Sequence, residues 1–403
     1  MRRWVARSSC VAVSLAAGLL IGEGVVRAAG LGNATLTRGS LHAFHAEAGW
    51  MGLPGCDTHY ELPGVFDVRV LCNSAGLRDR ERSLAKPAGS RRVAVLGDSF
   101  MWGYGVENGE MFSSRLEHLL ADTEVLNFGA NGYSTVQELV RLEADALAYA
   151  PDVAIVSFCS NDLGDNLDDK EGGRPAATLG DDGEVRIVNR PVRTAWKSGA
   201  KQWLRHNSRL FAAVEYETEA VRLRHKMQAR ADASASDRPR PGETRATDDE
   251  QAEPEFTLLD LFGRPSSEID RAWRVERELL AAIRDRMAKR GGRLLVVFVA
   301  MKEARSEQAF RKTVVAPFER PDLTLDVDRD RPGRRLAAIC DELGVPFLDL
   351  NPVFRSHEQP DVLFLRRNAH WSAAGHALAA QAVARRLAEC ELAVPRQPGA
   401  ISR

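Results

Sequence analysis

The feature that most constrains the fold is a repeated order of buried strand, small polar loop and helix that begins near Arg91. Residues 93–96 form a short, wholly apolar run that enters a glycine turn, as a central parallel strand does. Alternation of this kind predicts a parallel sheet with helices on both faces. The strands are expected at 93–96, 124–127, 153–158, 294–299 and 345–350.

The same alternation places helices between these strands. Ser134 and Thr135, with Gln137 and Glu138 three residues later, offer capping boxes for one of them. Gly291 and Gly292 end another just before the fourth strand. The helices are expected at 111–120, from 135 to the proline at 151, at 273–289, at 334–343 and at 372–389.

Residues suited to acyl transfer follow three of the expected strands, directly after each strand ends. Gly97-Asp98-Ser99 follows the first strand, where an exposed hydroxyl meets substrate at the carboxyl edge of an α/β sheet. The loops 127–133 and 159–162 follow the next two strands. We expect the N–H groups of Ser99 and Gly132 and the side-chain amide of Asn161 to form an oxyanion hole. The alternative is that Gly97-Asp98-Ser99 and Asn161-Asp162 only form turns and caps.

A serine nucleophile needs a general base, and His370 is the best placed of the nine histidines. It stands in the loop before the last helix, which follows a strand–helix unit and folds back to the edge that carries Ser99. The other histidines considered belong to the N-terminal extension, to a helix or to an insertion: His42, His45, His59, His118, His206 and His225.

Together these segments resemble the SGNH/GDSL hydrolase superfamily of bacterial exported or membrane-anchored type. Residues 97–100 (Gly-Asp-Ser-Phe) resemble its first block, and 104–106 (Tyr-Gly-Val) continue a variant found in exported members. Residues 127–134 resemble the second block, Asn161-Asp162 the third, and 370–376 (His-Trp-Ser-Ala-Ala-Gly-His) the fifth. Residues 73–79 resemble the segment that precedes the core in such members. Four blocks in the right order are a specific signal.

The resemblance implies a flavodoxin-like, three-layer α/β/α fold with a central parallel sheet. It also implies that Ser99 is the nucleophile, that His370 is catalytic, and that Gly132 and Asn161 belong to the oxyanion hole. Serine catalysis of this kind uses no cofactor, and we expect none. A structural zinc site is not expected either, because the sequence has no Cys-x-x-Cys pair or histidine cluster.

Two departures from the family pattern bear on activity. The family usually has an aspartate two or three residues before the catalytic histidine, where this chain has Asn368 and Arg367. An asparagine orients an imidazole but does not stabilise the imidazolium by charge, so we expect weak activity with Asn368 in the orienting role. Asp361 and Asp349 are outside candidates for that role. The third block commonly has a glycine where this chain has Cys159, which is expected to narrow the acyl site.

The N-terminus has a pattern that is typical of an export segment. Arg2, Arg3 and Arg7 precede an apolar run over 10–22, and Glu23 and Arg27 form an (i, i+4) pair beyond it. We favour an uncleaved single-pass anchor, with the N-terminus inside, over a cleaved signal peptide. The alternative to export is a cytoplasmic protein with a buried first helix. Outside the cytoplasm, we expect a disulfide between Cys56 and Cys72, and Cys340 and Cys390 are either bridged or buried.

These signals divide the chain into a signal anchor or signal peptide (1–30), an N-terminal extension (31–90) and a hydrolase domain (91–395). An insertion at 166–265 interrupts the domain, and its middle, 230–255, has the composition of a disordered segment. Its flanks, with Trp196, Trp203, Leu210 and Phe211, are expected to form a helical cap.

The 55 basic and 56 acidic residues nearly cancel, so the composition does not indicate nucleic-acid binding. The leading hypothesis is therefore hydrolysis or transfer of an O-acyl group on an envelope carbohydrate. One alternative is a lipid esterase or thioesterase, which an apolar, groove-forming insertion would favour. Another is a glycan-binding or assembly protein with weakened catalysis, which Asn368 favours. The membrane contact is expected through the N-terminal helix, and the oligomeric state is left open.

Overall fold

The computed structural model describes residues 14, 17–28, 41–62, 64–169, 172–180, 182–192, 261–263, 266–316, 326–366 and 368–394, with a few single positions between 204 and 218. The chain divides into two compact units. One comprises Met1–Leu41, Thr58–Glu61 and Thr194–Pro254, and the other comprises His42–Asp57, Leu62–Arg193 and Glu255–Arg403.

In the first unit, residues 17–28 are helical, and the predicted pair is present, with the Arg27 guanidinium 2.6 Å from the Glu23 carboxylate. Within the described residues, no helix has both the length and the apolar character that crossing a bilayer requires. Residues 10–13, 15 and 16 of the predicted apolar run lie outside the described residues. The predicted disordered segment at 230–255, and Trp196 and Trp203 of the predicted cap, lie outside the described residues.

The second unit is built on a five-stranded sheet with the order β11-β10-β7-β5-β6. All its strand pairs are parallel, which confirms the predicted sheet. β5 lies between β7 and β6, so the loops that follow these three strands leave the sheet side by side. The strands are β5 (Arg91–Leu96), β6 (Thr123–Asn127), β7 (Val153–Phe158), β10 (Arg293–Phe298) and β11 (Phe347–Asp349).

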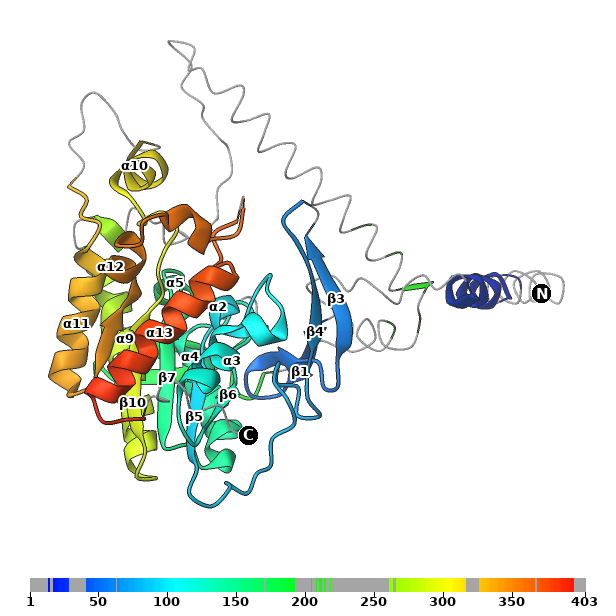
Figure 1. Ribbon diagram of the computed structural model, residues 1–403, viewed down its shortest axis with the longest axis horizontal. Helices are drawn as coiled ribbons and strands as arrows, with labels where there is room; N and C mark the ends of the chain where they lie inside the picture. The colour runs from blue at the N-terminus through cyan, green and yellow to red at the C-terminus, as the bar shows by residue number, and fades with distance from the viewer. Residues whose placement is uncertain are drawn as a thin grey trace, which may run out of the picture. The chain divides into compact units, whose positions relative to one another are not determined.

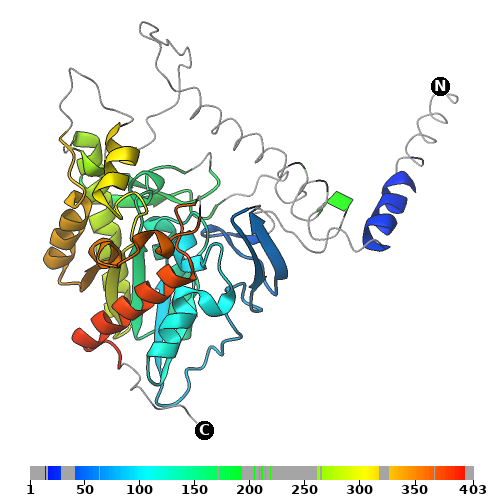
Figure 2. The same cartoon turned by 45° about the horizontal axis from the view of Figure 1, so that its top comes forward.

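Helices cover both faces of this sheet, because the apolar side chains of β5 and its neighbours divide between two buried apolar clusters. Ala94 and Leu96 pack against α4, α9 and α11, whereas Val93 and Val95 pack against α3, α12 and α13. Figures 1 and 2 show α3 and α13 lying together over the second face. The helices are α3 (Phe112–Leu119), α4 (Thr135–Ala144), α9 (Ser267–Ala288), α11 (Arg331–Leu343), α12 (Leu350–Arg355) and α13 (Ala373–Glu389). This is the expected three-layer architecture.

The observed helix boundaries differ from the predicted ones at helix ends where a side-chain cap determines the first helical residue. α9 begins six residues earlier than expected, because the Ser266 hydroxyl accepts a hydrogen bond from the Ile269 N–H. The capping box predicted at Ser134 does not form: Ser134 is the N-cap of α4, but its side chain makes no cap hydrogen bond. The side chain of Gln137, three residues later, instead donates to the Ala48 carbonyl at 2.8 Å.

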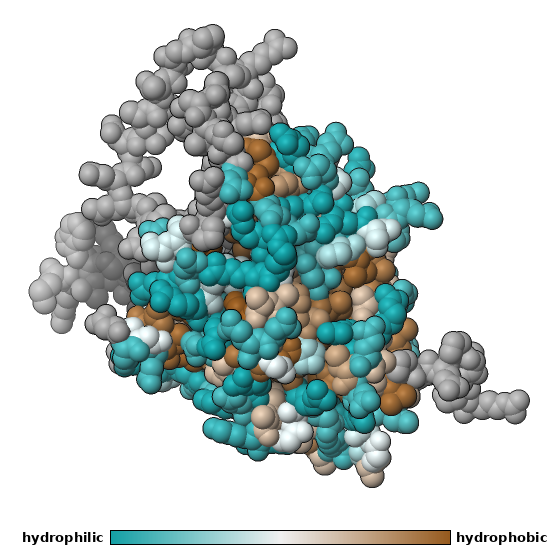
Figure 3. Space-filling model, turned by 90° about the vertical axis from the view of Figure 1, so that its left-hand side faces the viewer, coloured by the Kyte–Doolittle hydropathy of each residue, from teal (hydrophilic) through white to brown (hydrophobic). Residues whose placement is uncertain are grey.

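Short elements complete the second unit. β1 (His42–His45) and β2 (Gly49–Gly52) form an antiparallel hairpin from the N-terminal extension, and β8 (Ala176–Leu179) and β9 (Val185–Val188) form another inside the insertion. The others in this unit are β4 (Phe66–Leu71), α2 (Ser99–Trp102), η2 (Asn108–Glu110), η3 (Ala146–Tyr149), α5 (Asp162–Asp165), α10 (Glu307–Phe310), η4 (Arg311–Val315) and η6 (Pro360–Leu363). Most of β3 (Asp57–Leu62) belongs to the first unit. Figure 3 shows apolar side chains interspersed with hydrophilic ones on the face it presents.

Four of the cysteines have defined states that bear on the sequence analysis. Cys56 and Cys72 form the predicted disulfide. Cys340 and Cys390 are not bridged to each other: Cys340 is buried and Cys390 is half-buried, and both are free thiols.

Candidate active site

The site lies at the carboxyl edge of the sheet, where the loop after β5 turns into α2. Gly97 is required at the turn, because a Cβ atom there would stand 2.1 Å from the Ser157 hydroxyl and 2.4 Å from the Met101 side chain. Asp98 then caps α2 by accepting a hydrogen bond from the Phe100 N–H at 2.9 Å. Ser99 is therefore held as the first residue of a short helix, immediately after a buried strand.

The structure brings three predicted residues into one hydrogen-bonded series. The Ser99 hydroxyl lies 2.6 Å from Nε2 of His370, and Nδ1 of His370 lies 2.6 Å from Oδ1 of Asn368. The same Oδ1 atom accepts the backbone N–H of His370 at 2.9 Å. Two donors thus fix the Asn368 amide with its oxygen toward the imidazole, so Nδ1 carries the proton and Nε2 is free to accept one from Ser99.

The imidazole of His370 is held by aromatic neighbours that the sequence analysis did not identify. Tyr104 stacks on it with 4.1 Å between ring centroids and 21° between planes, and Phe100 lies 4.9 Å away by the same measure. Trp371, the next residue, donates its indole N–H to the Ala300 carbonyl at 3.0 Å. These contacts leave the ring little freedom to rotate away from Ser99.

Lys302, from the loop after β10, holds the backbone on either side of the Asn368 turn. Its ammonium group donates to the carbonyl oxygens of Leu365 at 2.7 Å and Asn368 at 2.6 Å. Partial burial lowers the pKa of Lys302. No local sequence signal marks this lysine, because it acts on a loop more than 60 residues further along the chain.

Gly132 and Asn161 stand on the two loops that flank Ser99. The Ala130 N–H donates to the Gly97 carbonyl at 3.0 Å, which ties the Gly132 loop to the turn that precedes Ser99. Gly132 has a φ of +74°, a conformation that glycine adopts without strain. The Asn161 side-chain nitrogen donates to Asp165 at 2.7 Å. A carboxamide has two N–H donors, so this bond leaves one for another acceptor.

Cys159, which replaces the usual glycine, has its thiol against Asp98. Burial raises the pKa of the Cys159 thiol well above its ordinary value, and the nearby Asp98 carboxylate raises it further. The thiol is therefore a neutral, buried group rather than a second nucleophile.

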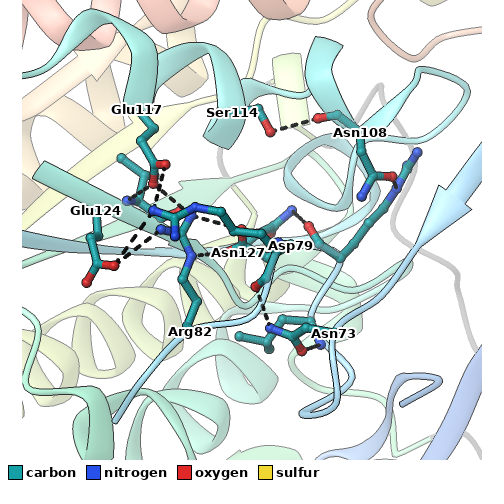
Figure 4. A network of polar contacts seen from close by, with 12 residues as sticks. Asn73, Asp79, Arg82, Asn108, Ser114, Glu117, Glu124 and Asn127 are labelled. Atoms are coloured by element: carbon teal, nitrogen blue, oxygen red, sulfur yellow. Dashed lines mark hydrogen bonds and ion pairs between the residues drawn. The ribbon is translucent and has the colours of Figure 1, made fainter. Parts of the chain in front are cut away.

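The segment at 73–79 holds the chain that follows Ser99. The buried Arg78 guanidinium donates to the carbonyl oxygens of Gly103 and Val106 and to the side chain of Asn108. Figure 4 shows this neighbourhood, with Asn108 bonded to Ser114 and the ion pairs of Arg82 beside it. The resemblance of residues 73–79 to other family members did not indicate this role of Arg78.

The other candidates for the base and its partner have different roles. The Asp361 carboxylate pairs with Arg305 at 2.5 Å, and Asp349 caps α12 by accepting the Asn351 N–H at 2.8 Å. His376 is buried and accepts the Phe112 N–H through Nδ1, and burial lowers its pKa to about 3. It is a neutral structural histidine. Over the described ranges, no set of three or more His, Cys, Asp or Glu is arranged to hold a metal ion.

Four carboxyl groups are buried around these loops: Asp98, Glu138, Asp162 and Glu276. Burial raises the pKa of Asp98 to about 6 and that of Glu276 to about 7. Burial and mutual repulsion raise the pKa of Glu138 and of Asp162 well above their usual range. The folded protein therefore binds protons more tightly at these groups than the unfolded chain, whose carboxyls titrate near pH ~4.

This proton affinity predicts that stability falls as pH rises. The contribution of the raised pKa values is fully present below pH ~4 and is lost as pH rises through about 6 for Asp98 and about 7 for Glu276. Glu138→Gln removes one of the buried acids, so the fall in the unfolding midpoint between pH 5 and pH 8 should become smaller. Thermal unfolding of both proteins across this range measures it. An unchanged slope in the variant would contradict the prediction.

The site thus has a hydroxyl, an imidazole and an amide in hydrogen-bonded series at the carboxyl edge of a parallel sheet. This arrangement is typical of an α/β serine hydrolase. The chain belongs to the GDSL-like Lipase/Acylhydrolase family, whose sequence model matches residues 95–378. It is thus a hydrolase of the class that acts on ester bonds. None of the curated proteins compared with the chain matches it significantly.

Several solved structures are similar to the chain at low identity. A lipase/acylhydrolase from Enterococcus faecalis is 12% identical with a TM-score of 0.37, over 76% of this chain and 99% of that one. A putative acylhydrolase from Bacteroides fragilis is 10% identical with a TM-score of 0.37, over 76% and 92%. An acetylxylan esterase from Geobacillus stearothermophilus is 13% identical with a TM-score of 0.36, over 75% and 96%.

Proposed function

We propose that the chain cleaves esters by a serine mechanism with Ser99 as nucleophile and His370 as general base. The Ser99 oxygen attacks the ester carbonyl carbon while its proton passes to Nε2 of His370. The N–H groups of Ser99 and Gly132 and the free amide hydrogen of Asn161 stabilise the oxyanion. His370 then gives the proton to the leaving alcohol, and an acyl group remains on Ser99. Water, or a second hydroxyl in a transfer reaction, accepts that acyl group by the reverse steps.

The observation that carries this proposal is the Ser99–His370–Asn368 series, with both side-chain contacts at 2.6 Å. It supports a serine activated by a base whose tautomer is fixed. The direct test is labelling with a fluorophosphonate probe followed by peptide mapping. A probe adduct on Ser99 is the expected result, and a folded protein that takes up no probe would refute the mechanism.

We propose an O-acyl group on an envelope carbohydrate as the substrate. The resemblance of residues 97–106 to exported members supports this choice, as does the replacement of a glycine by the larger Cys159 beside the nucleophile turn, which favours a short acyl group. Comparison of kcat/KM for acetyl and long-chain acyl esters tests the acyl part. A clear preference for long chains would favour the lipid esterase or thioesterase reading instead.

We propose that the N-terminal segment exports the rest of the chain, because arginines precede its apolar run and Cys56 and Cys72 form a disulfide. A reporter that folds only outside the cytoplasm, fused after Arg403, should be active. Activity only of a matched cytoplasmic reporter would overturn the proposal. Sequencing of the mature N-terminus distinguishes a retained anchor from cleavage near Ala29.

A non-catalytic glycan-binding or assembly role is the second candidate, and the neutral Asn368 in the orienting position favours it. An imidazolium formed during attack has no carboxylate beside it, which slows the chemistry. Binding of acylated glycan with no turnover and no probe adduct on Ser99 would favour this role over the enzyme.

A further inference from the structure

Trp50 brings the N-terminal extension into contact with the proposed oxyanion loop. It lies on β2, half-buried, and its indole N–H donates to the carbonyl oxygen of Asn131 at 3.0 Å. Its ring also lies beside Gly132, since a Cβ atom on that glycine would stand 3.9 Å from Cζ2 of Trp50. Trp50 therefore contacts the peptide group that joins Asn131 to Gly132.

The position of Trp50 is itself fixed from the side of α4. The Tyr133 hydroxyl donates to the backbone carbonyl of Trp50, and the Gln137 side chain donates to the Ala48 carbonyl at 2.8 Å. Ala48 and Tyr133 are buried in one small apolar cluster, and Trp50 packs against it. The β1–β2 hairpin is thus anchored to the residues that follow Gly132, and its indole is held in place rather than free in solvent.

The peptide geometry links this contact to the reaction. The Asn131–Gly132 peptide is trans, so its C=O and N–H groups point in opposite directions. An indole that holds the carbonyl on one side therefore holds the Gly132 N–H toward the other. A hydrogen bond to the carbonyl also polarises the peptide and strengthens its N–H as a donor. The turn over 130–133, closed by the Tyr133 N–H and the Ala130 carbonyl at 3.2 Å, also orients this peptide, and the indole holds it from outside the loop.

We propose that Trp50 is a positioning residue of the oxyanion hole, acting through the Asn131 carbonyl on the Gly132 N–H. The proposal rests on the proposed function, because it assigns Gly132 to the hole. It also gives the N-terminal extension a part in catalysis, since the residue comes from outside the segment that carries the nucleophile and base.

Trp50→Phe keeps an aromatic ring and removes the indole donor, and steady-state kinetics on a small acyl ester measures the effect. Removal of a whole oxyanion donor costs about 10²–10³ in kcat, so loss of its alignment should cost about 10-fold. We expect kcat per probe-titrated site to fall by that factor with KM unchanged, because the contact acts on the transition state. Trp273→Phe, in the core cluster around α9, makes the same change away from the loop and should lower stability without lowering kcat.

The outcomes separate the possible roles of Trp50. An unchanged kcat per titrated site in Trp50→Phe overturns the proposal, and so does a raised KM with unchanged kcat, which would indicate substrate binding. If Trp50→Phe does not fold, Tyr133→Phe, which loosens Trp50 through its backbone, decides by the same two criteria. Failure of the proposed function is distinguishable, because the wild-type chain would then neither turn over ester nor take up probe at Ser99.

Discussion

Ser99→Ala is expected to lower kcat/KM for a small acyl ester by about 10⁴-fold or more, to the limit of detection. The hydroxyl is the atom that bonds to the acyl group, and what remains without it is binding and the oxyanion hole. Folding should be unaffected, because the Ser99 hydroxyl is engaged with His370 at the start of a short helix and not in the apolar core. Hydrolysis assays and thermal unfolding on the same preparation measure both effects.

Companion variants make this result specific. His370→Ala should be about as damaging, and the double variant should be no worse than either single one, because serine and base act as a unit. Ser114→Ala removes a half-buried hydroxyl from α3 and should retain full activity. A loss of only a few-fold in Ser99→Ala would point to a different nucleophile.

The central sheet could be predicted because its strands are continuous apolar runs. Both neighbours of β7 are parallel strands, and both its faces are covered, so its six residues are all buried and the run stands out in the sequence. The helix ends were less accurate, because capping depends on which way a side chain turns. Ser134 has the right type for a capping box but does not form it, whereas Ser266 caps α9 with no glutamate or glutamine three residues later.

The contact between Ser99 and His370 could be predicted because each residue stands in a short motif at a defined place in the strand–helix order. The residues that contact the loops around them could not. Trp50 acts on a peptide 81 residues away, and Lys302 on a carbonyl 66 residues away. Such contacts depend on how loops fold over the sheet edge, and no local pattern of residue types encodes them. The stacking of Tyr104 on His370 is of the same kind, although Tyr104 lay in a recognised block.

Asn368 stands where the family usually has an aspartate, and the structure shows which contribution of an aspartate this asparagine does not make. Its oxygen accepts from Nδ1 of His370, so the productive tautomer is already present. The missing contribution is negative charge beside an imidazolium. The ammonium group of Lys302, which bonds to the Asn368 carbonyl, adds a positive charge to the same turn.

Substitutions at this position separate orientation from charge. Asn368→Asp keeps the acceptor and adds charge, so turnover should rise by about 10-fold, or ~1.4 kcal/mol of activation free energy. Asn368→Leu removes the acceptor from both N–H groups of His370. In a serine protease the wrong imidazole tautomer alone costs about 10⁴ in turnover, and here we expect turnover to fall by about 10²-fold.

The carboxylate of Asn368→Asp also favours the charged form of the His370 imidazole. The rising limb of the pH–rate profile should therefore move to higher pH in this variant. Steady-state kinetics across the pH range measures all three effects. Unchanged or lower turnover in Asn368→Asp, with an unmoved limb, would show that charge at this position does not limit the native chain. Activity that first appears in Asn368→Asp would instead make the glycan-binding role the better account of the native protein.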